Sequence, residues 1–312
     1  MTGRPVDPTG RFAPSPTGSL HAGSLLAAVG SYLDARTAGA RWLVRIEDLD
    51  TARIIPGCEE QMLRTLEAYG FEWDGDVVRQ SSRRDAYRDA LGRLAAAGRT
   101  FRCSCSRKDL AGDGGDHSPG YPGTCRHGPT RPGATAARFR VSDRSISFDD
   151  LFLGSRTFDT RALGDFVVER RDGVPSYQLA VVVDDAWQGV TRVVRGADLV
   201  ASTPWQIELQ EALGLPRPSY GHLPLLTEPD GRKLSKSLRS IPIPLVQATA
   251  GHSELMAASR ALTSTLTHLS QAPPPGLGDS SIKEVWKWAL AHWKPQALAG
   301  RTTVELSASS DR

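Results

Sequence analysis

Cysteine is scarce in this chain, with only four among 312 residues, which excludes a disulfide-built scaffold. No apolar run approaches the roughly 20 residues that a membrane-spanning helix needs. The opening stretch MTGRPVDPTG has no apolar core of a signal peptide, so we expect a cytoplasmic protein. The net charge is only +3, which excludes a polycation but permits a basic face. A chain of this length can still bury a large core.

The N-terminal part of the chain predicts the opening of a parallel α/β sheet. A short strand is expected at 11–14, and apolar residues then recur at helical spacing over 20–33, with Ser19 as the expected cap. RWLVRI (41–46) is a continuous apolar strand of the buried type, and a helix is expected over 56–69. This order is typical of a sheet covered by helices.

The rest of the chain alternates between strand-like and helical patterns. Residues 103–135 are rich in glycine, proline and cysteine, and an insertion in the sheet is expected to begin there. The other expected elements are a helix over 81–97, a β-rich middle at 138–173, buried strands at YQLAVVVDDA (177–186), GVTRVVRG (189–196) and YGHLPLL (220–226), and helices at 203–213, 252–270 and 280–293. The end of the chain, from residue 305, is expected to be disordered.

The loop RFAPSPTGSLHAG (11–23) begins a helix where open α/β sheets bind ligands. Free N–H groups and the positive end of the helix dipole favour an anion there. His21 and Ser24 fall in the first turn and can face that anion, while Gly18 and Gly23 let a large ligand approach the backbone. A simple strand–helix turn with a surface histidine is the alternative for a lone His-x-Gly.

A basic motif, KLSKS (233–237), follows the last predicted strand and an Asp-Gly turn. Lys233 and Lys236 can both reach the phosphates of one nucleotide, because lysine acts as a mobile point charge. A solvated basic loop is the alternative, and a Lys-x-x-Lys pair alone would favour it. The occurrence of both motifs in one chain makes nucleotide binding the better interpretation.

Together these motifs resemble the two signatures of the class I aminoacyl-tRNA synthetases. RIEDLDTAR, YQLAVVVDD and VVRGADLVASTP resemble the glutamyl branch of that family. The resemblance implies an α/β, Rossmann-like catalytic domain that uses ATP, with Mg²⁺ on its phosphates, to form an aminoacyl adenylate. The residues implied in ATP binding are His21, Gly23, Ser24 and Lys236, and those implied in catalysis are His21, Lys233 and Lys236. Ser24 stands where the general signature has a second histidine.

A glutamate pocket needs cations for two carboxylates and an acid for one ammonium. Arg11 and Arg195 end predicted strands, and arginine forks suit carboxylates. Glu47 can accept the ammonium, and Tyr177 offers a hydroxyl and an aromatic wall. Helix capping, surface ion pairing or a Mg²⁺ cluster are the alternatives for the acidic run EDLD (47–50). The resemblance assigns glutamate binding to Arg11, Phe12, Ala13, Pro14, Ser15, Glu47, Tyr177 and Arg195.

Three of the four cysteines are grouped as CSC (103–105) and Cys125, which suits tetrahedral zinc. From chemistry alone, His117 or His127 would be the fourth ligand. The resemblance instead implies a tyrosine, so that the ligands are Cys103, Cys105, Tyr121 and Cys125. Such zinc would be structural. Three free thiols in a mobile loop are the alternative, but the segment has few apolar residues with which to order itself.

The resemblance also implies partners and a division of the chain. Full glutamyl-tRNA synthetases continue into anticodon-reading domains, whereas only residues 238–312 follow the lysine motif here. We therefore expect a shortened paralogue, a monomer with no membrane partner, that transfers L-glutamate to the queuosine base at the wobble position of tRNA(Asp). The alternatives are a shortened enzyme that charges the terminal ribose of tRNA(Glu), and an inactive zinc-stabilised RNA-binding paralogue.

The expected segments are the first half of the catalytic domain (1–100), a zinc-containing RNA-contacting insertion (101–175), the second half of the catalytic domain (176–240), and a helical junction with a disordered tail (241–312). Within the insertion, the expected phosphate contacts are Arg126, Arg131 and Arg138.

Overall fold

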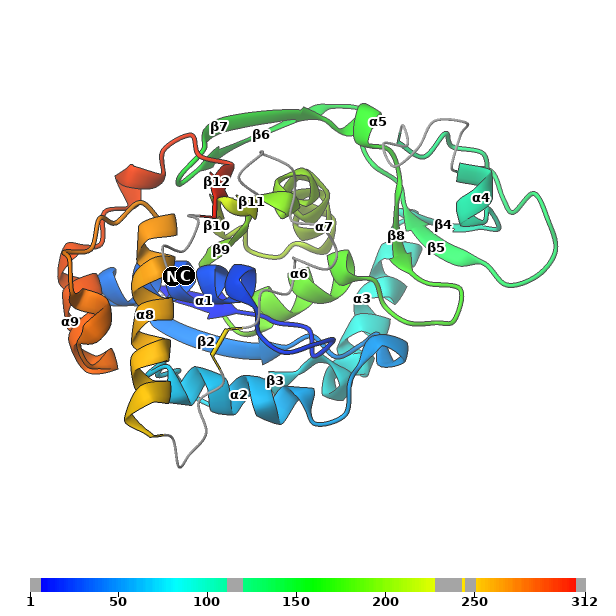
Figure 1. Cartoon of the computed structure of the whole chain (residues 1–312). Helices are drawn as coiled ribbons and strands as arrows, with labels where there is room; N and C mark the ends of the chain where they lie inside the picture. Colours follow the sequence, from blue (N-terminus) through cyan, green and yellow to red (C-terminus); the bar gives the residue numbers. More distant parts are fainter. Residues whose placement is uncertain (1–6, 111–119, 228–242, 245–250, 307–312) are drawn as a thin grey trace.

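The computed structural model describes residues 7–110, 120–227, 243–244 and 251–306 (Figure 1). The lysine motif with Lys233 and Lys236, as well as His117, lies outside the described residues. Among the described helices, none has both the length and the apolar character that a membrane crossing requires.

Parallel strands form the centre of the molecule, as the sequence predicts. The first group pairs in the order β1 (Thr9–Phe12), β2 (Arg41–Ile46) and β3 (Val78–Arg79). In the second group, β9 (Arg192–Gly196) pairs in parallel with β10 (Ser219–Leu223). The two groups meet at β1 and β9, where the Thr191 N–H donates to the Thr9 carbonyl at 3.0 Å. Their carboxyl ends therefore share one edge.

Helices cover this sheet, and all of them except α6 lie close to where the sequence predicts a helix. They are α1 (Ala22–Thr37), α2 (Cys58–Ala68), α3 (Arg84–Ala96), α6 (Tyr177–Trp187) and α7 (Thr203–Leu213). The main core lies between the first strands and α1, where Trp42 stacks on Phe12 and Phe71. His21, rather than the expected Ser19, caps α1, and the Ser19 hydroxyl instead donates to Gln61 at 3.1 Å.

The predicted strand YQLAVVVDDA is wrong, because this segment is the helix α6. The Ser176 hydroxyl accepts a hydrogen bond from the Leu179 N–H at 3.4 Å and so begins the helix. Residues 179–182 are all buried, so the helix is apolar on several sides and its 3.6-residue period is hidden. A short apolar run of this kind cannot be told from a buried strand by its pattern alone.

Residues 100–169 add two groups of antiparallel strands. The first is a sheet of β4 (Thr100–Cys103), β5 (Ala136–Phe139) and β8 (Phe166–Glu169), next to the short helices α4 (Arg107–Leu110) and α5 (Thr160–Leu163). The second is the hairpin of β6 (Ser145–Asp150) and β7 (Gly154–Asp159). Strand β6 pairs with β10 through Asp150 and Tyr220, so the hairpin joins the second parallel group (Figure 1).

The C-terminal region contains the two predicted helices, α8 (His252–His268) and α9 (Ile282–His292). Both pack on α1 and close the main core. A short strand that the sequence pattern did not indicate, β12 (Thr303–Glu305), pairs in parallel with β11 (Leu225–Thr227). The chain therefore returns to the sheet after the two helices.

Candidate active site

The start of α1 lies at the carboxyl edge of the sheet. His21 has extended backbone, and its Nδ1 accepts a hydrogen bond from the Ser24 N–H at 3.3 Å. Burial lowers the pKa of His21, so the ring is neutral near pH 7. A Cβ on Gly23 would lie 3.2 Å from His21 Cε1, and glycine therefore leaves room for the ring. The predicted ATP-binding residues His21, Gly23 and Ser24 are thus side by side.

A buried cluster of charges lies beneath this edge. Asp185, on α6, accepts from Arg11 Nε at 3.2 Å and from Arg45 Nη1 at 2.8 Å. Arg45 Nη2 also lies 3.5 Å from Glu47 Oε1. Burial raises the pKa of Asp185, but the two arginines outweigh it and the net shift is downward. Arg11, which the resemblance assigned to glutamate, is therefore already paired with a carboxylate in this structure.

Sequence reasoning missed Arg45 and Asp185. The signal for Arg45 was present, because a charged residue inside the apolar strand RWLVRI needs a buried partner. The neighbouring Asp184 is fully buried too, and its carboxylate accepts from Gln80, Arg83 and Tyr87 at 2.6 to 2.9 Å. Asp185 thus ties α6 to β1 and β2, and Asp184 ties it to residues 80–83 and to α3.

Glu47 follows β2 and faces the same edge as Tyr177. Its N–H donates to the Pro14 carbonyl at 2.9 Å, which ties the loop after β1 to the end of β2. Burial raises the pKa of Glu47, although Arg45 and Arg11 oppose the shift. Burial also raises the pKa of Tyr177, with opposing contributions from Arg195 and Arg11. The charged residues at this edge therefore affect the ionisation of both Glu47 and Tyr177.

Arg195 is buried at the end of β9 and makes hydrogen bonds to neutral groups. Its Nη1 donates to Gln206 at 2.8 Å and to the Tyr177 hydroxyl at 3.3 Å, and its Nη2 donates to Thr203 at 2.9 Å. Its Nε lies 3.1 Å from His222 Nε2. Within the described part of the chain, no carboxylate lies within 4.0 Å of this guanidinium.

A cleft of about 700 Å³ opens from this edge toward the β4–β5–β8 sheet. Ser15, Glu47 and Tyr177 line one end, and Cys103 and Cys105 line the other. Arginine side chains also line it: Arg53, Arg138, Arg170 and Arg171. Phe12 lies apart, since its ring packs in the main core.

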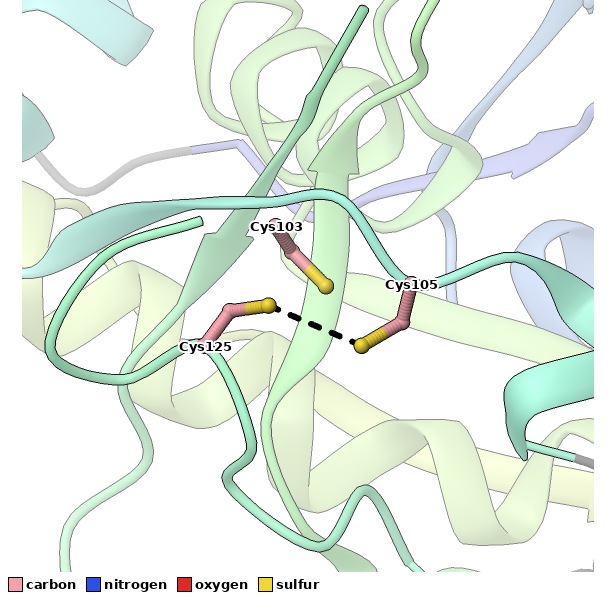
Figure 2. A group of neighbouring side chains, drawn as sticks. All are labelled: Cys103, Cys105 and Cys125. Atoms are coloured by element: carbon pink, nitrogen blue, oxygen red, sulfur yellow. Dashed lines mark hydrogen bonds between the residues drawn. The ribbon is translucent and has the colours of Figure 1, made fainter. Parts of the chain in front are cut away.

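The three predicted cysteine ligands converge (Figure 2). Their sulfur atoms all lie within 4.8 Å of one another, with Cys105 and Cys125 at 3.6 Å. The Tyr121 hydroxyl lies 3.4 Å from Cys103 Sγ and 4.0 Å from Cys105 Sγ. His127 is exposed and does not join the cluster. Burial opposes ionisation of Cys125, but hydrogen bonds involving Ser104 and Thr130 lower its pKa to about 5. Three thiols of this geometry can hold a metal ion.

The three arginines expected to contact RNA phosphates all have partners within the protein. Arg126 makes two 2.6 Å hydrogen bonds to Asp165, and Arg131 pairs with Asp109 at 3.0 Å. Arg138 is buried, with its guanidinium carbon 4.0 Å from the centre of the Tyr121 ring. The side chains of Arg126 and Arg131 remain 40% and 62% exposed, so RNA contact at these two residues stays a prediction, whereas Arg138 is buried.

A parallel α/β sheet with a histidine-capped helix at its ligand edge is typical of Rossmann-like nucleotide-binding folds. Residues 9–253 match the family model of the class I tRNA synthetases for E and Q, catalytic domain. The chain therefore belongs to this family, and it is a ligase.

Among curated relatives, a glutamyl-Q tRNA(Asp) synthetase from Pseudomonas aeruginosa is 51% identical over 91% of this chain and 92% of its own length. One of the same name from Aromatoleum aromaticum is 51% identical, covering 91% and 88% respectively. Among solved structures, a glutamate tRNA ligase from Elizabethkingia meningosepticum, crystallised with its amino acid, has a TM-score of 0.76. It is 25% identical and is matched over 97% of this chain and 67% of its own.

Proposed function

We propose that the protein activates L-glutamate with ATP and then transfers it to the queuosine base at the wobble position of tRNA(Asp), working as a cytoplasmic monomer. One observation carries the first half of the proposal. Arg195 is a buried cation whose described partners are neutral, and it lies beside Tyr177 at the ligand edge. A buried charge without a counter-ion is costly, and an anionic substrate would supply one.

Each group of the substrate then has a partner. Arg195 binds the side-chain carboxylate of glutamate. Its buried guanidinium is held in place by hydrogen bonds and can bind a carboxylate with two N–H groups, which suits the carboxylate that does not react. Glu47 accepts the ammonium, and the Tyr177 hydroxyl closes the pocket between them. Arg11 acts with Asp185, as a pair that keeps the pocket floor in place. Neutral amino acids would leave Arg195 unpaired, which supports an amino diacid as the substrate.

The α-carboxylate then attacks the α-phosphorus of ATP in line with the departing pyrophosphate. A new O–P bond forms, and the bond to pyrophosphate breaks with its electron pair. Catalysis consists of positioning and charge stabilisation, with no protein nucleophile. His21 and the start of α1 would stabilise the phosphates, aided by Lys233, Lys236 and Mg²⁺ bound to ATP. Replacement of Lys236 by alanine is expected to abolish adenylate formation.

In the second step, a hydroxyl of the queuosine cyclopentenediol attacks the carbonyl carbon of the mixed anhydride, and AMP leaves. The cleft supports this step, since it connects Tyr177 with the cysteine cluster and is lined by two exposed arginines, Arg53 and Arg171, that an RNA backbone could contact. Zinc would be held by Cys103, Cys105, Cys125 and Tyr121, where the donor set and spacing suit it. It would fix the far wall of the cleft.

The test is glutamate-dependent ATP–pyrophosphate exchange with no tRNA present, followed by transfer of labelled glutamate. The tRNA should come from cells that make queuosine and, as a matched control, from cells that cannot. Exchange without tRNA, with label only on tRNA(Asp) that contains queuosine, is expected. Exchange that requires tRNA(Glu), with label on its terminal ribose, would contradict the proposal and favour a conventional charging enzyme.

A further inference from the structure

A chain of buried polar side chains runs from the β6–β7 hairpin to Arg195. Asp150 ends β6, and its Oδ2 lies 2.5 Å from His222 Nδ1. His222, on β10, has its Nε2 3.1 Å from Arg195 Nε. The side chains of Asp150 and His222 are both 0% exposed. Parallel pairing of β9 and β10 places His222 directly beside Arg195, so the fold itself creates this contact.

The hydrogen bonds determine where the imidazole carries its proton. Asp150 Oδ1 accepts from the N–H groups of Phe152 at 3.0 Å, Leu153 at 2.9 Å and His222 at 3.2 Å, which fixes the carboxylate. Burial raises the pKa of Asp150, but these bonds lower it, so the group is ionised and can only accept. His222 must therefore carry hydrogen on Nδ1.

The unprotonated Nε2 of His222 is then an acceptor. Arginine has only donors, so its Nε–H needs such an acceptor. Burial lowers the pKa of His222, Asp150 opposes this shift and Arg195 adds to it, so the net shift is downward and the ring is neutral. With Nε held in this way, Nη1 faces Tyr177 and Gln206, and Nη2 faces Thr203 and the Leu199 carbonyl.

We propose that Asp150 and His222 are positioning residues, in which the carboxylate sets the histidine tautomer and the histidine sets the orientation of the Arg195 fork toward a substrate carboxylate. The inference rests on the proposed function. It assigns the β6–β7 hairpin a part in amino-acid binding, although this hairpin lies in the segment predicted as an RNA-contacting insertion. Asp150 would act through two other side chains and would not touch the substrate.

Asp150→Asn tests the relay with almost no change of shape. An amide can still accept from the main-chain N–H groups, but its NH₂ would donate to Nδ1 and so favour hydrogen on Nε2. Two donors would then face each other between His222 and Arg195. We expect the KM for glutamate in pyrophosphate exchange to rise about 10- to 100-fold, as for loss of a hydrogen bond to a charged group. The KM for ATP should not change.

A pair of substitutions at His222 separates positioning from packing. In His222→Gln, the side-chain oxygen can replace Nε2 as the acceptor, whereas His222→Phe removes the acceptor and keeps a ring. The glutamine variant should keep most of the affinity for glutamate, and the phenylalanine variant should lose it. Long-range ¹⁵N–¹H NMR should show hydrogen on Nδ1 of His222 in the wild type and on Nε2 in Asp150→Asn.

Asp34→Asn is the matched control, because Asp34 is also buried and pairs with Arg192 at the opposite end of β9. It should lower stability without a change in the KM for glutamate.

An unchanged glutamate KM in Asp150→Asn, or equal effects of the two His222 variants, would overturn the relay. If Asp150→Asn fails to fold, the comparison of His222→Gln with His222→Phe decides whether His222 positions Arg195 or only packs beside it. A wild-type protein without glutamate-dependent exchange would overturn the proposed function, and with it the relay.

Discussion

At the scale of single residues, the partners of an arginine say more about its part in substrate binding than its residue type or its place in the sequence does, as Arg195 shows. The sequence places many arginines near predicted strand ends, and Arg11 and Arg195 were assigned the same task. The structure separates them, because Arg11 pairs with Asp185 while the described partners of Arg195 are neutral. This difference comes from contacts between residues far apart in the chain, which a linear pattern does not contain.

Arg195→Lys should therefore weaken glutamate binding although it keeps the positive charge. Lysine is a point charge and cannot replace the planar fork that holds a carboxylate. We expect the KM for glutamate to rise roughly 30-fold, equivalent to about 2 kcal/mol, with little change in the KM for ATP. Pyrophosphate exchange at varied glutamate measures this effect.

Arg192→Lys is the matched control on the same strand. Arg192 pairs with Asp34, away from the ligand edge, so the glutamate KM of this variant should equal that of the wild type. Equal effects of the two substitutions would show that Arg195 contributes only to packing of β9.

Glu47 predicts a pH dependence of substrate binding. Burial raises the pKa of its carboxyl above the ordinary 4.5, so Glu47 becomes neutral at a higher pH than an exposed acid. A neutral Glu47 no longer attracts the ammonium group. The KM for glutamate should therefore rise as the pH is lowered from 8 toward 5.

Glu47→Gln provides the reference, because it cannot ionise. Its KM for glutamate should be at least about 10-fold higher at pH 8 and should vary little with pH. Exchange kinetics across this pH range, with both proteins in the same buffers, measure the difference. Parallel pH profiles for the wild type and the variant would assign the ammonium to another group.

At the scale of elements, the sequence predicted most helices and strands, but it did not predict the side-chain contacts and strand pairings that connect them. Strand β2 and helix α1 follow from clear apolar patterns. Helix α6 does not, since it is buried on several sides and its run of valines also suits a strand. The contacts of Asp150 and His222 depend on the pairing of β6, β9 and β10, and no local pattern encodes that pairing.

The ion cluster at Asp185 is one such contact between elements, because it connects β1 and β2 to α6 through Arg11 and Arg45. Asp185→Asn should lower the free energy of unfolding by about 3–5 kcal/mol, since buried Arg11 loses its counter-ion and buried Arg45 loses the nearest of its carboxylate partners. Asp279→Asn, which removes an exposed pair with Arg260, should have little effect. Urea unfolding at pH 7 measures both.

The same cluster predicts the direction of acid sensitivity. The folded-state pKa of Asp185 lies below its ordinary 3.8, so its ionised form stabilises the fold. This contribution is fully present above the unfolded pKa and is lost as the pH falls through the folded value. The stability difference between wild type and Asp185→Asn should thus be constant from pH 8 to 5 and shrink below pH 4. A difference that grew on acidification would contradict this assignment.

At the scale of the whole molecule, the cleft joins two chemically different parts. One end is a wall of charged and polar groups on the parallel sheet, and the other is the cysteine cluster on the small antiparallel sheet. The sequence predicted each part from its own motif. It did not predict that both line one cleft, nor that the β6–β7 hairpin joins the main sheet.

Metal removal should separate the two steps of the proposed reaction. The apolar cluster around the cysteines is small, made of Phe101, Cys103 and Cys125 with Cys105 and Tyr121 packed against it. This cluster is small, although Phe139 and Phe166 of the same sheet pack in another core cluster, and a metal would add stabilisation at the cysteines. Chelation should therefore loosen the far wall of the cleft while the core on α1 stays folded.

Glutamate-dependent pyrophosphate exchange should then persist in the metal-free protein, whereas transfer to tRNA should fall by about 10-fold or more, as when the support of a metal site is lost. Cys125→Ser should reproduce this result and reduce bound zinc, measured by elemental analysis. Cys58→Ser is the matched control, because Cys58 is equally buried but lies on α2 outside the cluster. It should keep its zinc and both activities.

Equal loss of exchange and transfer would mean that the metal supports the entire fold. An unchanged zinc content in Cys125→Ser would mean that the ion is bound elsewhere.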